Sequence, residues 1–95
     1  MSFNYGLRPT KTQKIASSGS SSAVTDVFGS QTEYVRIAAD ADCHIEFGGN
    51  ASSNPTATSS TIFIPADQPE IFKVSPGEKV AAIGSSNVFV TELSA

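Results

Sequence analysis

The chain of 95 residues has no tryptophan, one cysteine and one histidine. Because Cys43 stands alone, neither an intramolecular disulfide nor a cysteine-based zinc site can form, and stability must come from packing or from subunit association. A metal site with two histidines is excluded within one subunit, since His44 has no second histidine. No apolar run approaches the roughly 20 residues of a membrane-spanning helix, and residues 1–8 lack the apolar core of a signal peptide. We therefore expect a protein made in a cytoplasm, with no membrane partner.

Charge is sparse and uneven along the sequence. Only 16% of the residues are charged, and the formal net charge is −3. Residues 1–25 contain three cations and no acid, whereas residues 26–95 contain all nine acids and the other three cations. Separated cations without interleaved aromatics are a weak nucleic-acid signal, and the acidic body would repel a phosphate backbone. We therefore expect no nucleic-acid partner.

What is present is a period-two pattern, which is typical of half-buried strands. Val35, Ile37 and Ala39 share one face, with Tyr34 and Arg36 on the other. No helical pattern competes with the alternating segments. Strands are predicted at residues 12–17, 23–28, 33–39, 43–47, 61–64, 71–74, 79–83 and 87–93. About eight short strands separated by turn residues predict an all-β fold, a small antiparallel β-sandwich of jelly-roll or Greek-key type.

Turn chemistry separates the strands. Residues 40–42 are short enough to close a hairpin, and the Ser-Pro-Gly-Glu sequence at 75–78 has the composition of a type II turn that joins two antiparallel strands. Residues 84–87 are expected to do the same, and residues 50–60 to form an exposed, flexible loop. A basic arm at residues 1–11 is predicted to precede a single sandwich domain at residues 12–95.

Alternation also predicts which side chains form the core. We expect one face of each strand to be buried and the other to meet solvent. The predicted core residues are Val35, Ile37, Cys43, Ile45, Phe47, Ile62, Ile64, Phe72, Val74, Val80 and Val90, completed by Phe89 or Leu93.

The sharpest catalytic lead is the trio Asp42, His44 and Glu46, which alternate along one strand and project from one face. That spacing suits a metal or acid–base site, but polar residues also belong on any solvated strand face, and one strand supplies no cleft. Cys43 points away from His44, so the two cannot act together, and Cys43 is expected to be a small buried apolar residue. We therefore expect no catalytic residue, no metal and no cofactor.

Candidate partner-binding residues come from the basic arm and from exposed aromatics. Arg8, Lys11 and Lys14 are expected to help the arm bind a neighbouring subunit, either along an acidic groove or as an added strand. Tyr34 and Phe63 lie opposite apolar neighbours on their strands, so each is expected to be exposed or covered by a partner, unless a second buried face accounts for it.

Over residues 33–92 the sequence resembles small structural proteins of tailed bacteriophages that are encoded among the head genes. The segments that carry the resemblance are VRIAA (35–39), DCHI (42–45), NPTAT (54–58), IPA (64–66), PEIFKVSPGEKVA (69–81) and VTE (90–92). The resemblance implies a β-sandwich decoration or cement protein without catalytic residues. Such a protein binds the major capsid protein on the capsid surface of the virion, as a homo-oligomer on the particle. Residues 1–32 lie outside the resemblance.

Two other functions remain open. The first is another structural position on the particle, such as a head–tail or tail component. The second is a carbohydrate- or ligand-binding module in which Tyr34 or Phe63 stacks on a ring. The absence of tryptophan weighs against this module. No enzyme is expected, because no pair of titratable groups can be placed in one cleft.

Overall fold

Eight β-strands and no helix make up residues 8–94, the part of the chain that the computed structural model describes. No helix long and apolar enough to cross a membrane occurs in this part. The strands are β1 (Arg8–Ala16), β2 (Ser22–Ala23), β3 (Tyr34–Ala39), β4 (Cys43–Gly48), β5 (Ile62–Ile64), β6 (Glu70–Lys73), β7 (Lys79–Ile83) and β8 (Asn87–Ser94).

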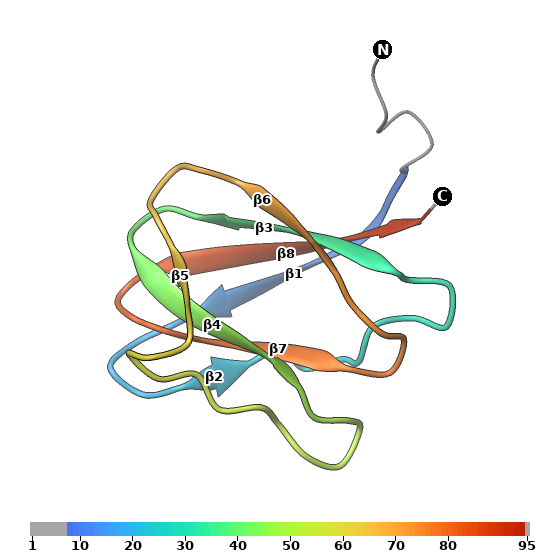
Figure 1. The fold of residues 1–95 in the computed structure, drawn as a ribbon, viewed down its shortest axis with the longest axis horizontal. Coiled ribbons are helices and arrows are strands. Elements are labelled where there is room, and N and C mark those ends of the chain that lie inside the picture. Colours follow the sequence, from blue (N-terminus) through green and yellow to red (C-terminus); the bar gives the residue numbers. More distant parts are fainter. Residues whose placement is uncertain (1–7, 95) are drawn as a thin grey trace.

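The chain folds as one long antiparallel hairpin that is rolled into two sheets. From the closed end outward, the pairs are β4–β5, β3–β6, β2–β7 and β1–β8. Pairs β3–β8 and β4–β7 complete sheet A, with the order β1-β8-β3-β6, and sheet B, with the order β2-β7-β4-β5. In Figure 1 the blue β1 runs beside the red β8, so the first and last strands of the described chain are neighbours in one sheet. This is the pairing pattern of a jelly roll, and the predicted antiparallel β-sandwich is confirmed.

Three tight turns join the two sheets, and the prediction that they connect paired strands is wrong. Residues 40–42 lead from β3 in sheet A to β4 in sheet B, while residues 75–78 and 84–87 also connect strands of different sheets. The turn at 75–78 itself forms, because Glu78 N–H donates to the Ser75 carbonyl over 3.2 Å and Gly77 has φ +86°. Turn residues specify that the chain reverses, but burial of the apolar faces decides which sheet receives the next strand.

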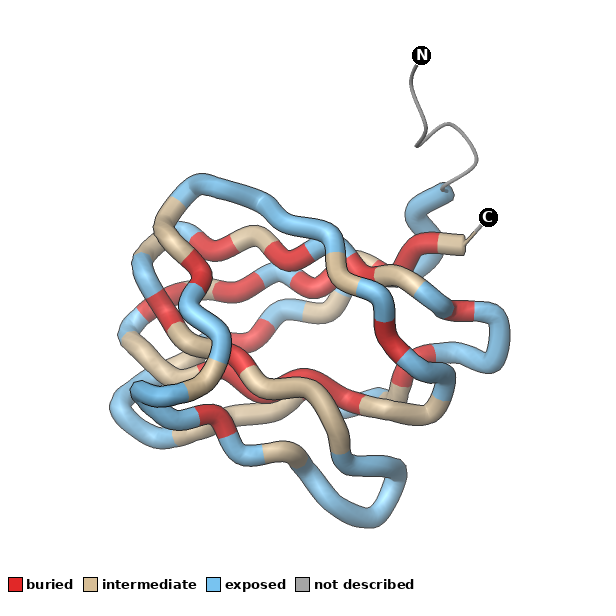
Figure 2. Tube along the Cα trace, viewed as in Figure 1, coloured by how far each residue is buried: buried red, intermediate tan, exposed pale blue. Residues whose placement is uncertain are grey.

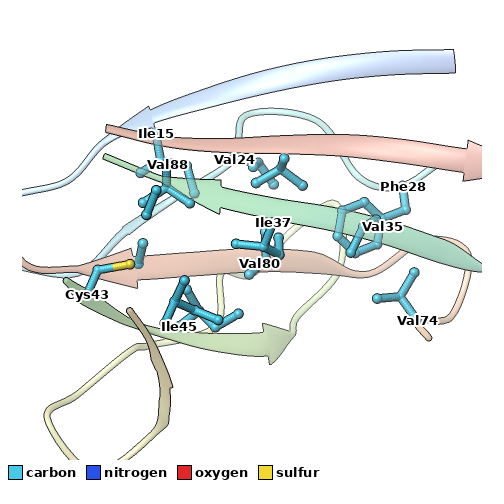
Figure 3. Close-up of a cluster of buried hydrophobic side chains, with 14 residues drawn as sticks. Ile15, Val24, Phe28, Val35, Ile37, Cys43, Ile45, Val74, Val80 and Val88 are labelled. Atoms are coloured by element: carbon cyan, nitrogen blue, oxygen red, sulfur yellow. The ribbon is translucent and has the colours of Figure 1, made fainter. Parts of the chain in front are cut away.

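The core lies between the two sheets and is built mainly from β-branched side chains. Figure 3 shows this cluster between the strands, and Figure 2 shows buried residues alternating with more exposed ones along β3 and β8. Nearly all of the predicted core residues are buried or packed against the cluster, and Leu93 rather than Phe89 is buried. The prediction that Ile62 belongs to the core is wrong, since 38% of it is exposed. It faces Ile45 in register, but β5 is a three-residue edge strand and covers little of its own surface.

Several buried residues lie outside the predicted core. They are Ile15, Val24, Phe28, Ala39, Val88, and the alanines at 57, 81 and 82. Phe28 is only 1% exposed although it lies in the connection between β2 and β3. Its N–H donates to the Glu78 carbonyl over 2.8 Å, and its carbonyl accepts from Gly77 N–H over 2.9 Å. The turn at residues 75–78, before β7, therefore holds the β2–β3 connection in place and keeps Phe28 between the two sheets.

The predicted boundary between arm and domain differs from the structure. Residues 1–7 lie outside the described part, but residues 8–11 belong to β1 and pair with β8 of the same chain. Gln13 closes part of the free edge of β1, because its side-chain amide accepts from Asp26 N–H over 3.0 Å and donates to the Asp26 carbonyl over 3.1 Å. Residues 8–11, which the sequence analysis places in an arm that binds a neighbouring subunit, thus pair with β8 of their own chain.

Residues 49–61, between β4 and β5, cover part of the outer surface of sheet B. Ala57 is 1% exposed, and its N–H donates to Ser21 Oγ over 2.9 Å. Lys79 Nζ donates to Asn54 Oδ1 over 2.9 Å, which leaves this lysine 8% exposed. The expectation of a wholly exposed loop is therefore wrong at its anchor points, although most of its residues are exposed (Figure 2).

Candidate functional site

All four strands of sheet A contribute to its outer face. Because side chains alternate, the residues between the inward-pointing ones point outward together; Leu93 belongs to this outward set although it is only 6% exposed. Three rows cross the sheet by register: Lys14–Phe89–Ala38, then Thr12–Thr91–Arg36–Ile71, and then Leu93–Tyr34–Lys73. These ten residues make up the surface that we call the outer face of sheet A.

Positive charge gathers on this face. Lys14 on β1, Arg36 on β3 and Lys73 on β6 are all exposed, and none of the three rows contains an acid. Within residues 8–94, the only ion pair joins Lys11 to Asp26, with Nζ and Oδ2 2.5 Å apart. The three cations of the face therefore have no carboxylate at ion-pairing distance in the described part of the chain.

Apolar surface lies between these cations. Ile71 is 50% exposed and Phe89 40%, while the hydroxyls of Thr12 and Thr91 lie 3.0 Å apart between β1 and β8. A shallow hollow of about 320 Å³ adjoins Phe89 and Ala38 and reaches Asp40, Asp67 and Pro69. The face thus combines accessible apolar side chains with unpaired cations.

A second hollow lies at the other end of β3. It has a volume of about 310 Å³ and is lined by Gln31, Glu33, Tyr34 and Ser94. Tyr34 is half-buried there, beside Leu93 in register. An aromatic ring among polar side chains is a combination that can hold a polar ring such as a sugar.

A second apolar patch lies on β5, the edge strand of sheet B. It consists of two side chains that point to opposite faces of this short strand: Ile62, 38% exposed, on the side of Ile45, and Phe63, 50% exposed, on the side of His44. The Phe63 ring packs against His44 of β4, with the ring centroids 5.2 Å apart. The β5 patch and the outer face of sheet A therefore belong to different sheets of the sandwich.

The predicted partner-binding residues do not form one site. Lys14 and Tyr34 lie on the outer face of sheet A, whereas Phe63 belongs to the β5 patch. Lys11 pairs with Asp26 of its own chain, and this contact raises the pKa of Lys11 and lowers that of Asp26. Arg8 is exposed at the start of β1, opposite Ser94.

Sequence reasoning did not single out four other members of the sheet A face. Arg36 was assigned outward, but only as part of a solvated strand face, and Lys73, Ile71 and Phe89 were not proposed for binding. The signal that points to them is the same period-two alternation, combined with a strand order that the sequence does not reveal.

The trio Asp42, His44 and Glu46 does not converge on a common centre. Asp42 precedes β4 and accepts from Ala66 N–H over 2.8 Å, His44 packs on Phe63, and Glu46 accepts from the adjacent Phe47 N–H over 3.2 Å. Within residues 8–94, no three His, Cys, Asp or Glu side chains lie where they could hold a metal ion together.

Two side chains that could react or ionise, Cys43 and Glu92, are buried. Cys43 is 2% exposed, as predicted, and burial raises the pKa of its thiol. Glu92 is 3% exposed; its Oε1 accepts from the Thr32 hydroxyl over 2.6 Å and from Gly29 N–H over 3.0 Å. The carboxylate thereby fastens the connection before β3 to β8, and it lines neither hollow.

Comparisons with protein-family models, with curated proteins and with solved structures returned no match to this chain.

Proposed function

We propose that the protein is a non-catalytic structural protein of a bacteriophage virion, a capsid decoration or cement protein that binds and bridges neighbouring major capsid protein subunits. The observation that carries the proposal is the presence of two exposed apolar patches on different sheets of one small domain. One is the outer face of sheet A, with Ile71 and Phe89, and the other is the β5 patch, with Ile62 and Phe63.

Four large apolar side chains exposed over the two sheets of one small domain favour contact with another protein surface. A binder of one partner needs one such surface, whereas a protein that bridges two neighbours needs two. A standard interface covers about 800 Å² on each partner. Two contacts would therefore occupy a substantial part of the domain's 5219 Å² of accessible surface. On a repeating lattice, two modest contacts strengthen each other because the second one forms within an assembled particle.

The resemblance to phage head-region proteins supplies the partner in this proposal, since the fold alone does not. Jelly rolls occur in viral capsid and lectin domains, among others. Made in the host cytoplasm, the protein would assemble on the capsid surface, in several copies on each particle. A position at the head–tail junction or in the tail would use the same two patches.

The test compares phage particles that contain the protein with particles made after its gene is deleted. We expect the purified virions to contain the protein in many copies, and the deleted particles to lose their DNA at a lower temperature. Adding the purified protein back should restore heat resistance. Absence of the protein from purified virions would contradict the proposal.

Bridging is tested with one variant of each patch. Phe63→Ser alters the β5 patch and Phe89→Ser alters the outer face of sheet A, while Ser52→Ala on the exposed loop is the control. We expect each patch variant to bind particles more weakly and to restore little heat resistance, because one remaining contact cannot bridge two subunits. Full restoration by both single variants would show that the protein does not act as a bridge.

A second candidate, a carbohydrate-binding module, is favoured by one observation, the hollow that Tyr34 shares with Gln31, Glu33 and Ser94. A panel of monosaccharides titrated into the protein and followed by NMR would distinguish the two functions. Carbohydrate binding predicts shifts around Tyr34 that disappear in Tyr34→Ala. The decoration function predicts none.

A further inference from the structure

We infer that the outer face of sheet A binds an acidic protein surface that carries apolar side chains between its carboxylates. This deepens the proposed function by giving the chemistry of one of its two contacts, and it rests on that function only where particles serve as the partner.

The arrangement of charge on the face is the first step. Lys14, Arg36 and Lys73 lie on three different strands; Lys14 is opposite the exposed Phe89 in register, Arg36 is opposite the exposed Ile71, and Lys73 follows Ile71 on β6. Cations that already have carboxylate partners contribute little to binding a second one. None of these three makes an ion pair among residues 8–94, where Lys11 and Asp26 make the only one, although Asp40 lies near enough for its charge to interact with that of Lys14.

The contrast with the rest of the chain is the second step. The protein has nine acids against six Lys and Arg residues, yet the three rows of this face contain three cations and no acid. A face whose charge opposes that of its own molecule attracts an acidic partner locally, while the acidic remainder repels non-specific contacts. Arg36 adds specificity, because a guanidinium can bind a carboxylate through two parallel hydrogen bonds.

The same charges argue against two other occupants. A second copy docked through this face about a two-fold axis would bring cations towards cations, since such an interface uses the same surface on both subunits. A nucleic acid would need a groove of cations that follows its backbone, whereas the cations of this face lie one each on β1, β3 and β6.

The probe is a short peptide of alternating aspartate and leucine, titrated into the ¹⁵N-labelled full chain at low and at high salt. We expect amide shifts in β8, β3 and β6, with none in β4 or β7. Binding should weaken by roughly tenfold when salt rises from about 0.05 M to about 0.5 M, because screening shortens the reach of the exposed charges. No shifts at low salt, or shifts centred on β5, would overturn the inference.

Two variants with the same net charge separate this face from general electrostatics. Replacing Lys14, Arg36 and Lys73 with glutamine removes three positive charges, while the control replaces the exposed serines at 20, 52 and 59 with glutamate. Each variant has a formal net charge of −6, which is the −3 of the unchanged chain minus three. We expect the glutamine variant to lose roughly tenfold or more in affinity and the control much less. Equal losses in the two variants would overturn the inference.

Two further arms complete the test. A single-stranded oligothymidine that binds this face more tightly than the peptide would replace the acidic protein partner with a nucleic acid and overturn the inference.

On phage particles, the unchanged protein and the control should bind while the glutamine variant does not. If the glutamine variant binds as well as the others, this inference fails and the proposed function stands. If the unchanged protein does not bind particles, the proposed function fails, and the peptide titration still decides this inference.

Discussion

Replacing Phe28 with alanine removes an aromatic side chain that the strand pattern does not place in the core. Phe28 is 1% exposed, between the two sheets (Figure 3). The backbone on which it sits cannot move inward to fill the space, because Glu78 and Gly77 hold it through hydrogen bonds of 2.8 and 2.9 Å. The substitution should therefore leave a cavity in addition to losing buried apolar surface. Large-to-small changes of this kind cost about 3–5 kcal/mol, a large share of the roughly 5–15 kcal/mol that stabilises a small domain.

Urea unfolding followed by circular dichroism measures this effect, since the chain has no tryptophan to report by fluorescence. With a urea dependence of about 1.5 kcal/mol/M, the midpoint of Phe28→Ala should fall by about 2–3 M. Phe89→Ala is the matched control, because Phe89 is 40% exposed on the outer face of sheet A. It should cost less than about 1 kcal/mol.

A third aromatic gives an intermediate point. The sequence places Phe47 in the core; in the structure it is partly buried, lies against the core cluster and packs on Phe72 with the ring centroids 5.3 Å apart. We expect Phe47→Ala to cost about 2 kcal/mol, between the other two phenylalanines. If Phe28→Ala shifts the urea midpoint no more than Phe89→Ala does, Phe28 is not packed between the two sheets as described, and the reasoning fails.

Three further predictions test other parts of the domain. Gly49→Ala should destabilise by about 2 kcal/mol or more, because φ is +72° and a Cβ would lie 2.5 Å from the Ser53 carbonyl oxygen, whereas Gly19→Ala, in open space, should change the urea midpoint little. Hydrogen bonds from the Asn87 backbone and then its side chain lower the pKa of Asp40. The stability they contribute should be lost as the pH falls through that lowered pKa, and carboxyl NMR of Asn87→Ala should show the pKa raised but still below its ordinary value. Since burial shields Cys43 and raises its pKa, a thiol reagent should label it at the rate of unfolding; fast labelling of the folded protein would contradict its placement.

Alternation along the chain was enough to determine the fold class and most of the core. Val35 and Ile37 are fully buried, as their spacing predicts, and the outward position of Tyr34 and Arg36 follows from the same pleat. Turn residues located the chain reversals correctly, including the one at 75–78. These are local properties, because each depends on residues next to one another in the sequence.

Only the tertiary structure decided which strands became neighbours. The reversal at residues 40–42 is compatible both with a hairpin and with a crossing between sheets, and the crossing occurs because it turns the apolar faces of β3 and β4 towards one core. The sequence predicts a strand at residues 23–28, but β2 ends at Ala23, and Phe28 is buried in the following connection because the turn at 75–78 holds its backbone in place. The same holds for the proposed binding face, where Lys14, Arg36 and Lys73 are far apart along the chain. They share a surface because β8 pairs with β1 on one side and with β3 on the other, while β6 adds to β3. Long-range strand order is set by the burial of all apolar faces together, and this cannot be read from any one segment.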